Sequence, residues 1–520
     1  HSRYNKPREA KTHQAKQLGR MTTCHCRSIL RLIVLVLVLA PLQAFVPPTS
    51  VRRPFVGLAT SRRDDDDTCS LCIIGGGVSG LAAACTAAGQ TDVVLLEASS
   101  TLGGRVQSDW TKDGFCLDRG FAVFVEEYPN SKALLDYDAL DLHPFDPGAL
   151  VKLPNKAKLA RVADPLRQPK RLLAALLSPV GKLRDKLRLA PLLIHVFTTP
   201  IEEFFQEEET DTFTCLKERW KFSDDFISEF LEPFLEGIFL APLTQQSSRM
   251  FHFVFQMFSI GSVSLPRNGM GAVADQLAEK ARSVGVDVRT NHPITAIRQL
   301  DNGDFEVRIQ GASSLVAQKV ILATDVSRTQ TLLSTLEGYE SIANENDKPV
   351  ERSVGCLYYS FKGDPPVKDP ILILNGLPTR GTAQSPINNA CFPSVVCDNY
   401  APPGQHLCSV SILSPVLDAF SGQHDKLDQA VRNQLSEWFP SHNIQEWKLE
   451  GIYEIPNAQP AQFGATYPAN VNEGRDCTTF RGHKLPKGLI VAGDHMATSS
   501  LNGALGSGIQ AGKVATEGMP

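Results

Sequence analysis

The sequence has no excess of positive charge. Its 52 lysines and arginines are outnumbered by 56 aspartates and glutamates, which gives a formal net charge of −4. Proteins that hold nucleic acid through its phosphates carry a basic domain or a basic stripe. We therefore expect no nucleic-acid partner. With 520 residues, 42% of them apolar, the chain is long enough for about two or three domains with cores of their own.

Internal repeats, a cysteine framework and a metal motif are also missing. No period of about 20 to 50 residues recurs, which excludes a solenoid or a propeller. The 12 cysteines follow no framework spacing, so a disulfide-stapled fold is not expected. Cys69 and Cys72 form a C-x-x-C pair, but they belong to a strand rather than to a helix N-terminus, which disfavours redox chemistry. Because no His, Cys and carboxylate cluster has metal-ligand spacing, we predict no metal.

Near the N-terminus, no apolar run is long enough to cross a bilayer. Nine apolar residues, Leu32–Ala40, follow Arg27 and Arg31, whereas a spanning helix needs about 20. Such a short run after basic residues is typical of a signal-peptide core. The next segment, residues 45–63, is rich in Ser, Thr, Pro and Arg and has no acidic residue, as transit peptides do.

Together these two parts resemble the bipartite presequence of algae with complex plastids, in which a phenylalanine follows the signal cleavage point as Phe45 follows Ala44. We therefore predict an upstream extension at residues 1–20 and a signal and transit presequence at residues 21–68. The expected location is a plastid, in the stroma or at the thylakoid surface. A secreted protein with a disordered start is the alternative.

A glycine-rich turn occupies residues 75–80, Gly-Gly-Gly-Val-Ser-Gly. An apolar strand at residues 71–74 precedes it, and an alanine-rich helix at residues 81–88 follows it. A second strand, residues 92–96, then ends at Glu97. Glycines alone also mark ordinary turns, but this order of strand, glycines, helix, strand and acid is typical of a dinucleotide-binding unit.

Three of the four glycines of this turn have a predicted role. Gly75 permits the tight turn, and Gly77 lets backbone N–H groups approach a pyrophosphate at the positive end of the helix. Gly80 lets the helix and the strand pack closely. Glu97 lies at the spacing expected for an acid that accepts hydrogen bonds from the ribose hydroxyls. The predicted contacts of this block also include Val78, Ser79 and Ala98.

Between its two ends the chain changes from a helical to a strand-like pattern. From about residue 165 to 258, apolar residues at three- and four-residue spacing predict helices that break at Pro179, Pro191 and Pro200. Strands are predicted at residues 286–289, 305–309, 319–323, 356–361 and 408–413, an amphipathic helix at 426–439, and a buried parallel strand at 489–492.

Nucleotide-binding signals thus stand at both ends of the chain and near Ala323. The sequence predicts an α/β fold, with a discontinuous Rossmann-like dinucleotide-binding domain and an inserted α+β substrate domain. The dinucleotide domain is expected at residues 69–150, 265–345 and 479–520. The inserted parts are expected at residues 151–264, which are helical and face the substrate or a membrane, and at residues 346–478, which form a sheet.

Further motifs point to a two-part nucleotide. They are Gly103-Gly104-Arg105, Asp118-Arg119-Gly120-Phe121, the stretch Pro266–Gly271, Gly493-Asp494, and Asn502-Gly503-Ala504 with Gly506 and Gly508. From about Cys69 to its C-terminus the chain resembles the superfamily of flavin-containing amine oxidases, phytoene desaturases and protoporphyrinogen oxidases.

The resemblance implies FAD as cofactor and assigns a place to each motif residue. Gly75, Gly77, Gly80 and Glu97 would hold the ADP part. The backbone of Ile294 would pair with the adenine. Ala323 is also predicted to belong to the cofactor site. The resemblance places Gly103, Gly104, Arg105, Gly493, Asn502 and Gly503 on the side of the pyrophosphate and the flavin. It places Asp494 at the ribityl-phosphate region and Ala504 by the isoalloxazine.

The residues around the C-terminal motif favour some members of this superfamily over others. Amine oxidases place an aromatic residue after the Gly-Asp pair, but residues 496–501 contain no Tyr or Trp. Amine oxidation is therefore disfavoured, although Tyr453 or Tyr467 could reach in from another strand. No cysteine follows Gly493, so we expect non-covalent FAD.

The helical insert suggests a large and apolar substrate. Residues 251–258 form an aromatic stripe, which either lines a cavity or belongs to an ordinary helix core. Residues 170–189 alternate basic residues and leucines, as a helix on an anionic membrane surface does; a solvated face of a soluble helix pair is the alternative. Residues 458–460, Ala-Gln-Pro, are either part of the cavity wall or a simple strand and turn.

These observations favour an FAD-dependent oxidoreductase that oxidises or desaturates a hydrophobic plastid metabolite, such as a carotenoid or a porphyrinogen. Its electron acceptor would be oxygen or a quinone. Flavin chemistry of this kind requires mainly that the substrate be held against the cofactor, and the sequence identifies no catalytic residue. The alternatives are a non-redox isomerase that uses reduced FAD, an amine oxidase, and a non-catalytic flavin-binding protein.

Overall fold

A sheet of seven strands carries the glycine-rich turn. The computed structural model describes residues 67–164, 167–343, 351–461 and 475–518, so nearly all of the predicted presequence lies outside the described residues and stays a prediction. The strand order is β10-β2-β1-β13-β12-β11, and β21 pairs with β13 beside β12. The parallel strands are β1 (Thr68–Ile74), β2 (Val93–Leu96), β10 (Asp287–Arg289), β13 (Leu315–Leu322) and β21 (Leu489–Val491), and the antiparallel ones are β11 (Ile294–Gln299) and β12 (Phe305–Ile309).

The parallel strands β2 and β21, and the C-terminal parts of β1 and β13, are buried on both faces, which explains their continuous apolar runs. Leu71 and Ile73 of β1 pack with helices α2 (Val78–Ala87), α12 (Gly271–Ser283) and α17 (Leu501–Thr516). Cys72 and Ile74, which alternate with them, pack on the other side with β11, β12 and α13 (Val326–Leu333). The predicted strands of this region and the buried parallel strand near the C-terminus are confirmed.

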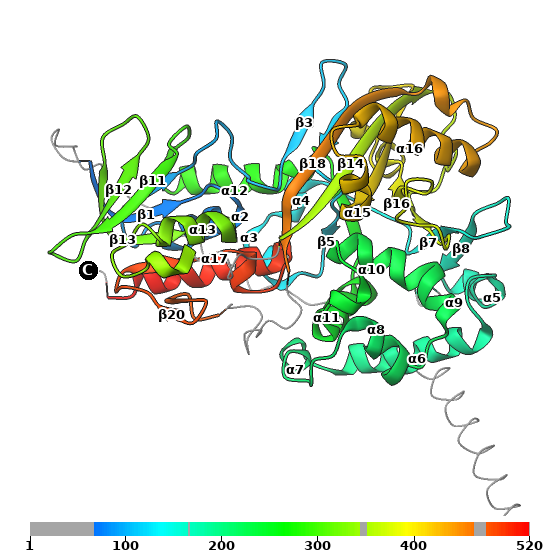
Figure 1. The fold of residues 1–520 in the computed structure, drawn as a ribbon, viewed down its shortest axis with the longest axis horizontal. Coiled ribbons are helices and arrows are strands. Elements are labelled where there is room, and N and C mark those ends of the chain that lie inside the picture. Colours follow the sequence, from blue (N-terminus) through cyan, green and yellow to red (C-terminus); the bar gives the residue numbers. More distant parts are fainter. Residues whose placement is uncertain (1–66, 165–166, 344–350, 462–474, 519–520) are drawn as a thin grey trace, which may run out of the picture. The chain divides into compact units, whose positions relative to one another are not determined.

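The two ends of the described chain meet through small residues on two helices. α17 packs along α2, and both lie beside the first sheet in Figure 1. A Cβ atom on Gly508 would lie 2.1 Å from the carbonyl oxygen of Ser79, and one on Gly512 would lie 2.7 Å from that of Ala83. Glycine therefore permits a contact between the helices that no side chain would allow, and this contact fixes the C-terminal segment next to the glycine-rich turn.

A second sheet forms the other half of the structure. Its order is β18-β14-β17-β16-β15-β7-β8, and α16 (His424–Trp438) packs on it through Leu427, Val431 and Leu435. The long strands β14 and β18 extend from this sheet toward the first one (Figure 1). The strands are β7 (Gly148–Lys152), β8 (Ala160–Ala163), β14 (Glu351–Lys362), β15 (Leu372–Asn375), β16 (Ile387–Cys391), β17 (Gln405–Leu413) and β18 (Lys448–Pro460); a small sheet joins β5 (Phe124–Val125), β9 (Val263–Pro266) and β6 (Leu142–Pro144).

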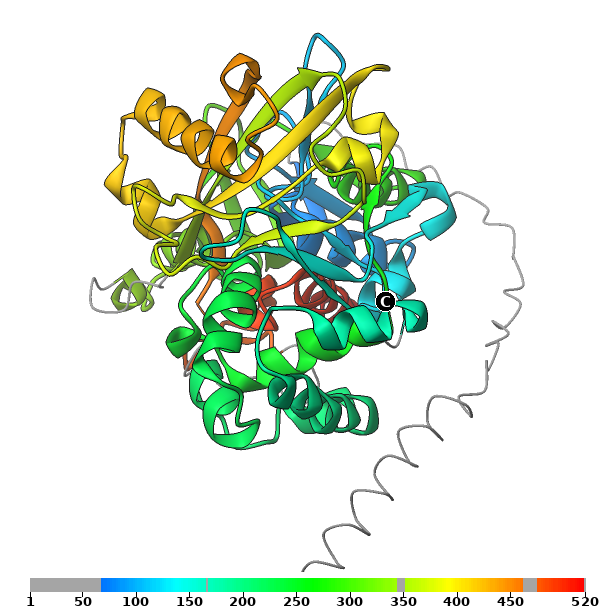
Figure 2. The ribbon, with the colours of Figure 1, turned by 90° about the vertical axis from the view of Figure 1, so that its right-hand side faces the viewer.

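The helical region lies below the second sheet in the views of both Figure 1 and Figure 2. It contains α5 (Leu172–Leu177), α6 (Leu183–Thr198), α7 (Ile201–Phe204), α8 (Thr212–Thr214), α9 (Asp224–Phe226), α10 (Glu232–Phe239) and α11 (Ser248–Ile260). The predicted breaks at Pro179 and Pro200 are confirmed, because both lie between helices. The break at Pro191 is wrong: this residue lies inside α6. Leu192 and Val196, which are fully buried after it, stabilise the helix and offset the backbone hydrogen bond that proline lacks.

Candidate functional site

A cavity of about 980 Å³ lies between the first sheet, the second sheet and the helical region. One end of it is lined by glycines and charged residues from three distant segments, and the other by apolar side chains. Most of the predicted cofactor-binding residues lie on its wall: Gly75, Gly77, Val78, Ser79, Glu97, Ala98, Gly103, Gly104, Arg105, Ile294, Ala323, Gly493, Asp494 and Ala504. Their contacts with a cofactor stay predictions, but they surround one space.

Three of the predicted residues lie behind this wall. A Cβ atom on Gly80 would be 1.9 Å from the carbonyl oxygen of Gly75, and one on Gly503 would be 1.9 Å from that of Thr498. The side-chain oxygen of Asn502 accepts a hydrogen bond from the backbone N–H of Asn130 at 3.0 Å. These residues therefore hold the backbone of the wall in place, as the sequence predicts for Gly80.

The glycine-rich turn and the Gly103-Gly104 pair contact each other directly. The N–H of Gly103 donates to the carbonyl of Gly76 at 2.8 Å, and Gly77 and Gly103 form a parallel bridge. A Cβ atom on Gly77 would meet nothing within 4 Å, so this position is open to the cavity. Gly77 is the N-cap of α2 and supplies no capping side chain. The first N–H groups of α2 therefore suit an anion such as a phosphate.

Glu97 is held at the edge of the cavity by backbone donors. Its Oε2 accepts a hydrogen bond from the N–H of Gly76 at 2.7 Å, and its Oε1 accepts one from the N–H of Ser99 at 2.8 Å. The Ser99 hydroxyl also donates to Oε1 at 2.8 Å. These bonds fix the carboxylate beside the glycine-rich turn, and Oε2 keeps a further lone pair for a donor. The predicted bonds to ribose hydroxyls fit this geometry.

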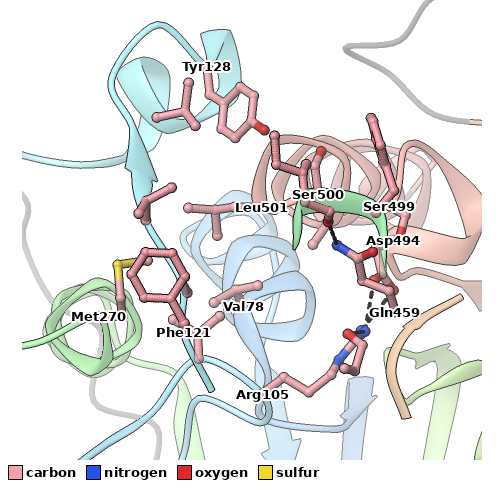
Figure 3. A pocket seen from close by; sticks show the side chains of 18 of the residues that line it. Val78, Arg105, Phe121, Tyr128, Met270, Gln459, Asp494, Ser499, Ser500 and Leu501 are labelled. Carbon is pink, nitrogen blue, oxygen red and sulfur yellow. Dashed lines mark hydrogen bonds and ion pairs between the residues drawn. The ribbon is translucent and has the colours of Figure 1, made fainter. Parts of the chain in front are cut away.

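An ion pair between Arg105 and Asp494 joins the second glycine pair to the C-terminal motif (Figure 3). The two bonds measure 2.9 Å and 2.8 Å, and Arg105 also donates to the carbonyl of Ala458 on β18 at 2.9 Å. Burial raises the pKa of the Asp494 carboxyl, but the charge and hydrogen bonds of Arg105 outweigh it and leave that pKa below its usual value. The charged end of the cavity is thus built from three segments that lie far apart in the sequence.

Two hydroxyl groups on the cavity wall have no partner among the described residues. They are the Oγ atoms of Ser79, in the first turn of α2, and of Ser499, just before α17. Buried polar groups are usually hydrogen-bonded. Together with the open position at Gly77 and the paired charges of Arg105 and Asp494, these hydroxyls fit a ligand rich in oxygen atoms, such as a dinucleotide.

The C-terminal helix contributes less to this end than expected. The Oγ of Ser500 is the N-cap acceptor for the N–H of Gly503 at 3.1 Å, so a side chain already satisfies this N–H of α17.

The sequence patterns did not predict Tyr128 or Met270 as residues that line the cavity (Figure 3). Tyr128 belongs to a loop before a short helix and follows no motif. Phe121, part of a motif noted in the sequence, does line the cavity.

The apolar end of the cavity is formed mainly by helices. Phe255 and Phe258 of the predicted aromatic stripe line it, whereas Phe251 and Phe253 are fully buried in the helix core, so each interpretation holds for part of the stripe. Other lining side chains are Leu189 and Leu193 of α6, Phe234 and Ile238 of α10, and Phe230.

Of the β18 residues considered for the cavity wall, some line the cavity and others do not. Ala458 and Gln459 line the cavity. Tyr453 does not, because its hydroxyl donates to Asp109 at 3.0 Å instead. Tyr467 lies outside the described residues.

A cluster outside the cavity has the composition of a metal site. The ligand atoms of His195, Glu207 and His252 lie within 4.8 Å of one another. However, Arg219 donates to Glu207 at 2.6 Å, which places a positive charge in the cluster. Trp220 donates to Nε2 of His252 at 3.2 Å, so a neutral His252 carries its proton on Nδ1, which faces Glu207. The geometry favours a polar network, and the prediction of no metal stays a prediction.

Comparison with known proteins identifies the family to which the chain is similar. A family model described as flavin-containing amine oxidoreductase matches residues 78–514. Carotenoid phi-ring synthase from Streptomyces griseus is 26% identical over 317 residues, 56% of this chain and 57% of that protein. Carotenoid 3,4-desaturase from Haloarcula japonica is 24% identical over 464 residues, 77% of this chain and 86% of that protein. This chain therefore spans little more than half the length of the first relative.

Among solved structures, an oxidoreductase from Methanosarcina mazei is similar, with a TM-score of 0.63 and 16% identity. The match covers 85% of this chain and 99% of the other. This likeness concerns the fold, and it agrees with a Rossmann-like cofactor domain joined to a substrate domain.

Proposed function

This chain belongs to the flavin-containing amine oxidoreductase family, and from that premise we propose that it binds FAD non-covalently and oxidises or desaturates an elongated hydrophobic molecule. The observation that carries the proposal is the single cavity with two different ends. Its charged, glycine-rich end suits a dinucleotide, and its apolar end suits a substrate with few polar groups. The family resemblance predicted from the sequence motifs is confirmed.

Different residues of the charged end would bind different parts of the cofactor. The first turn of α2, opened by Gly77, would bind the pyrophosphate through backbone N–H groups. Arg105 would offset the phosphate charge, and Glu97 would accept from the ribose. Bound FAD supplies a two-electron acceptor, and the protein orients the substrate and excludes water. Non-covalent binding is supported because none of the described cysteines lines the cavity.

The apolar end supports a hydrophobic substrate such as a carotenoid or a porphyrinogen. Its aromatic side chains include Phe230, Phe234, Phe255 and Phe258, which offer contact area but no hydrogen bond. The two curated relatives are named for carotenoid reactions, which favours the carotenoid class. The lining residues found just after the Gly-Asp pair include no Tyr or Trp, so an amine substrate is less well supported. We propose oxygen or a quinone as acceptor and a plastid as location.

Anaerobic reduction tests this proposal. We expect an acyclic C40 polyene, added to the oxygen-free flavoprotein, to bleach the visible flavin absorbance because the substrate passes two electrons to the cofactor. A primary amine serves as the matched comparison and should leave the absorbance unchanged. Bleaching by the amine alone would contradict the proposal in favour of an amine oxidase. Turnover of the polyene only after the flavin has been reduced beforehand would identify an isomerase, and no response in either state would indicate a binding protein.

We also propose that α5 and α6 rest on an anionic membrane surface. Leu173, Leu177, Leu183 and Leu187 are 58–74% exposed, and basic residues alternate with them. An exposed apolar face beside basic residues is typical of helices that lie in a membrane interface. Among the described residues, no helix combines the length and the apolar character that a membrane span requires. Leu189 and Leu193 of α6 line the cavity, so a lipid-soluble molecule would have a short path into it.

Vesicle binding tests this surface. Replacing Leu183 and Leu187 with serine should weaken binding to anionic phospholipid vesicles about tenfold, because each buried leucine contributes about 1.5–3 kcal/mol of transfer free energy and only part of it is realised at an interface. Co-sedimentation measures the bound fraction. Val284 is also an exposed apolar residue, 47% accessible, and Val284→Ser is the control that should bind as the wild type does. Equal binding by all three proteins would contradict the proposal.

A further inference from the structure

A β-bulge on the cavity wall turns two neighbouring amide side chains the same way. The register of β16 against β17 shifts between Ile387 and Asn389. Adjacent residues of a regular strand point to opposite faces, but a bulge redirects them. A Cβ atom on Gly237 of α10 would lie 3.0 Å from the Nδ2 atoms of both Asn388 and Asn389. Both carboxamides therefore face α10.

These amides are buried and incompletely satisfied. Asn388 is 1% and Asn389 is 4% exposed. The Nδ2 of Asn388 donates to the carbonyl of Pro233 at 3.0 Å, which fixes the orientation of that side chain. The Oδ1 atoms of both residues have no hydrogen-bond partner among the described residues. A buried carbonyl oxygen left unpaired costs stability, so a missing donor would explain why both oxygens persist here.

Asn389 is also part of the cavity wall, together with Gly237, Phe234 and Ile238. The other polar side chains near the apolar end already have partners. Asp164 accepts from Arg167 at 2.8 Å, and the hydroxyl of Ser259 donates to the carbonyl of Phe255 at 2.6 Å. Asn389 therefore differs from them, because its carboxamide contributes to an otherwise apolar wall while its Oδ1 has no partner among the described residues.

We propose that Asn389 is a specificity-determining residue that binds a hydroxyl group on the hydrophobic substrate. A hydroxyl can donate to Oδ1 and accept from Nδ2 of the same amide. A site built for a hydroxyl discriminates strongly against an analogue that lacks it, because the amide then stays unpaired. The bulge and Gly237 hold the amide in this position. The inference rests on the proposed function, since it names a chemical group on the substrate of the same cavity.

Two matched isoprenoids test the inference without turnover. Farnesol and farnesene have the same C15 skeleton, and only the alcohol carries a hydroxyl. We expect the flavin-loaded wild type to bind farnesol about tenfold more tightly, as followed by the change in the visible flavin spectrum or by the shift of thermal unfolding. Asn389→Leu keeps a similar volume and should remove this preference by weakening farnesol binding about tenfold, with farnesene binding unchanged.

The controls separate this inference from the proposed function. Asn433→Leu, on the exposed face of α16, should keep the wild-type preference. Asn389→Ala adds no atoms and replaces the leucine variant if that variant does not fold. Equal binding of the two ligands by the wild type, or an unchanged preference in both Asn389 variants, would overturn the role of Asn389 and leave the proposed function standing. If neither ligand binds, the hydrophobic substrate itself is contradicted.

Discussion

Gly77→Val should give a folded protein that no longer retains FAD. A Cβ atom at this position meets no other atom within 4 Å, and the backbone φ of −73° suits any residue. The added methyl groups would instead fill the space through which a phosphate reaches the N–H groups of α2. Losing about two charge-assisted hydrogen bonds, at roughly 1.5 kcal/mol or more each, corresponds to FAD affinity about 100-fold lower or worse.

The measurement is FAD per protein chain after purification, together with urea unfolding of the cofactor-free protein. Gly80→Ala is the informative contrast, because its Cβ would lie 1.9 Å from the carbonyl oxygen of Gly75. That variant should lose both stability and FAD, whereas Gly77→Val should lose FAD alone. Wild-type occupancy in the Gly77 variant would show that the cofactor does not approach this turn.

Arg105→Ala should weaken both the fold and the cofactor site. The substitution leaves the carboxylate of Asp494, only 8% exposed, without its ion-pair partner. Breaking a fully buried pair costs about 3–5 kcal/mol. We expect about 2 kcal/mol here, because the Arg105 side chain is 37% exposed and water screens the pair. FAD affinity should also fall, since a positive charge near the phosphates is lost.

A double variant distinguishes the two effects of Arg105. Arg105→Met combined with Asp494→Leu removes both charges, so urea unfolding should recover most of the lost stability, while FAD binding stays weak. If the double variant instead bound FAD as the wild type does, the ion pair would have no part in the cofactor site.

The same pair has a defined pH dependence. The pKa of Asp494 is lower in the folded protein than its usual value, which is near 3.9 in an unfolded chain. The unfolded state therefore binds more protons in this range. The stabilisation is complete above about pH 4 and is lost as the pH falls through the folded-state pKa. In Arg105→Ala, burial should raise the pKa of Asp494 above its unfolded value, so the sign should reverse and this carboxyl should destabilise the fold as the pH rises above about 4.

The sequence predicted the elements whose signals are local. The strands β1 and β2 and the helix α2 follow from an apolar run, three glycines and an alanine-rich stretch within about 30 residues, the usual size of such a unit. β21 could be predicted because a strand buried on both faces is apolar throughout. The motif around Arg105 and Asp494 indicated the charged end of the cavity for the same reason: each residue belongs to a recognisable block.

Features made by tertiary contacts could not be predicted in this way. The orientation of Asn389 depends on a bulge and on Gly237, which lies far away in the sequence. His195, Glu207 and His252 come together only because α6, α11 and the loop after α7 pack against one another, so their sequence spacing shows no metal pattern. Pro191 was expected to end a helix, but buried neighbours hold α6 together across it. In each case packing decides the structure, and a local pattern does not contain that information.

The most direct test of the account is the visible absorption spectrum of the purified protein. The account predicts flavin absorbance, with FAD released in an amount equal to that of the protein when the chain is denatured without breaking covalent bonds. A colourless protein that takes up no added FAD would contradict the account. A flavin that stays attached to the denatured chain would contradict the claim of non-covalent binding.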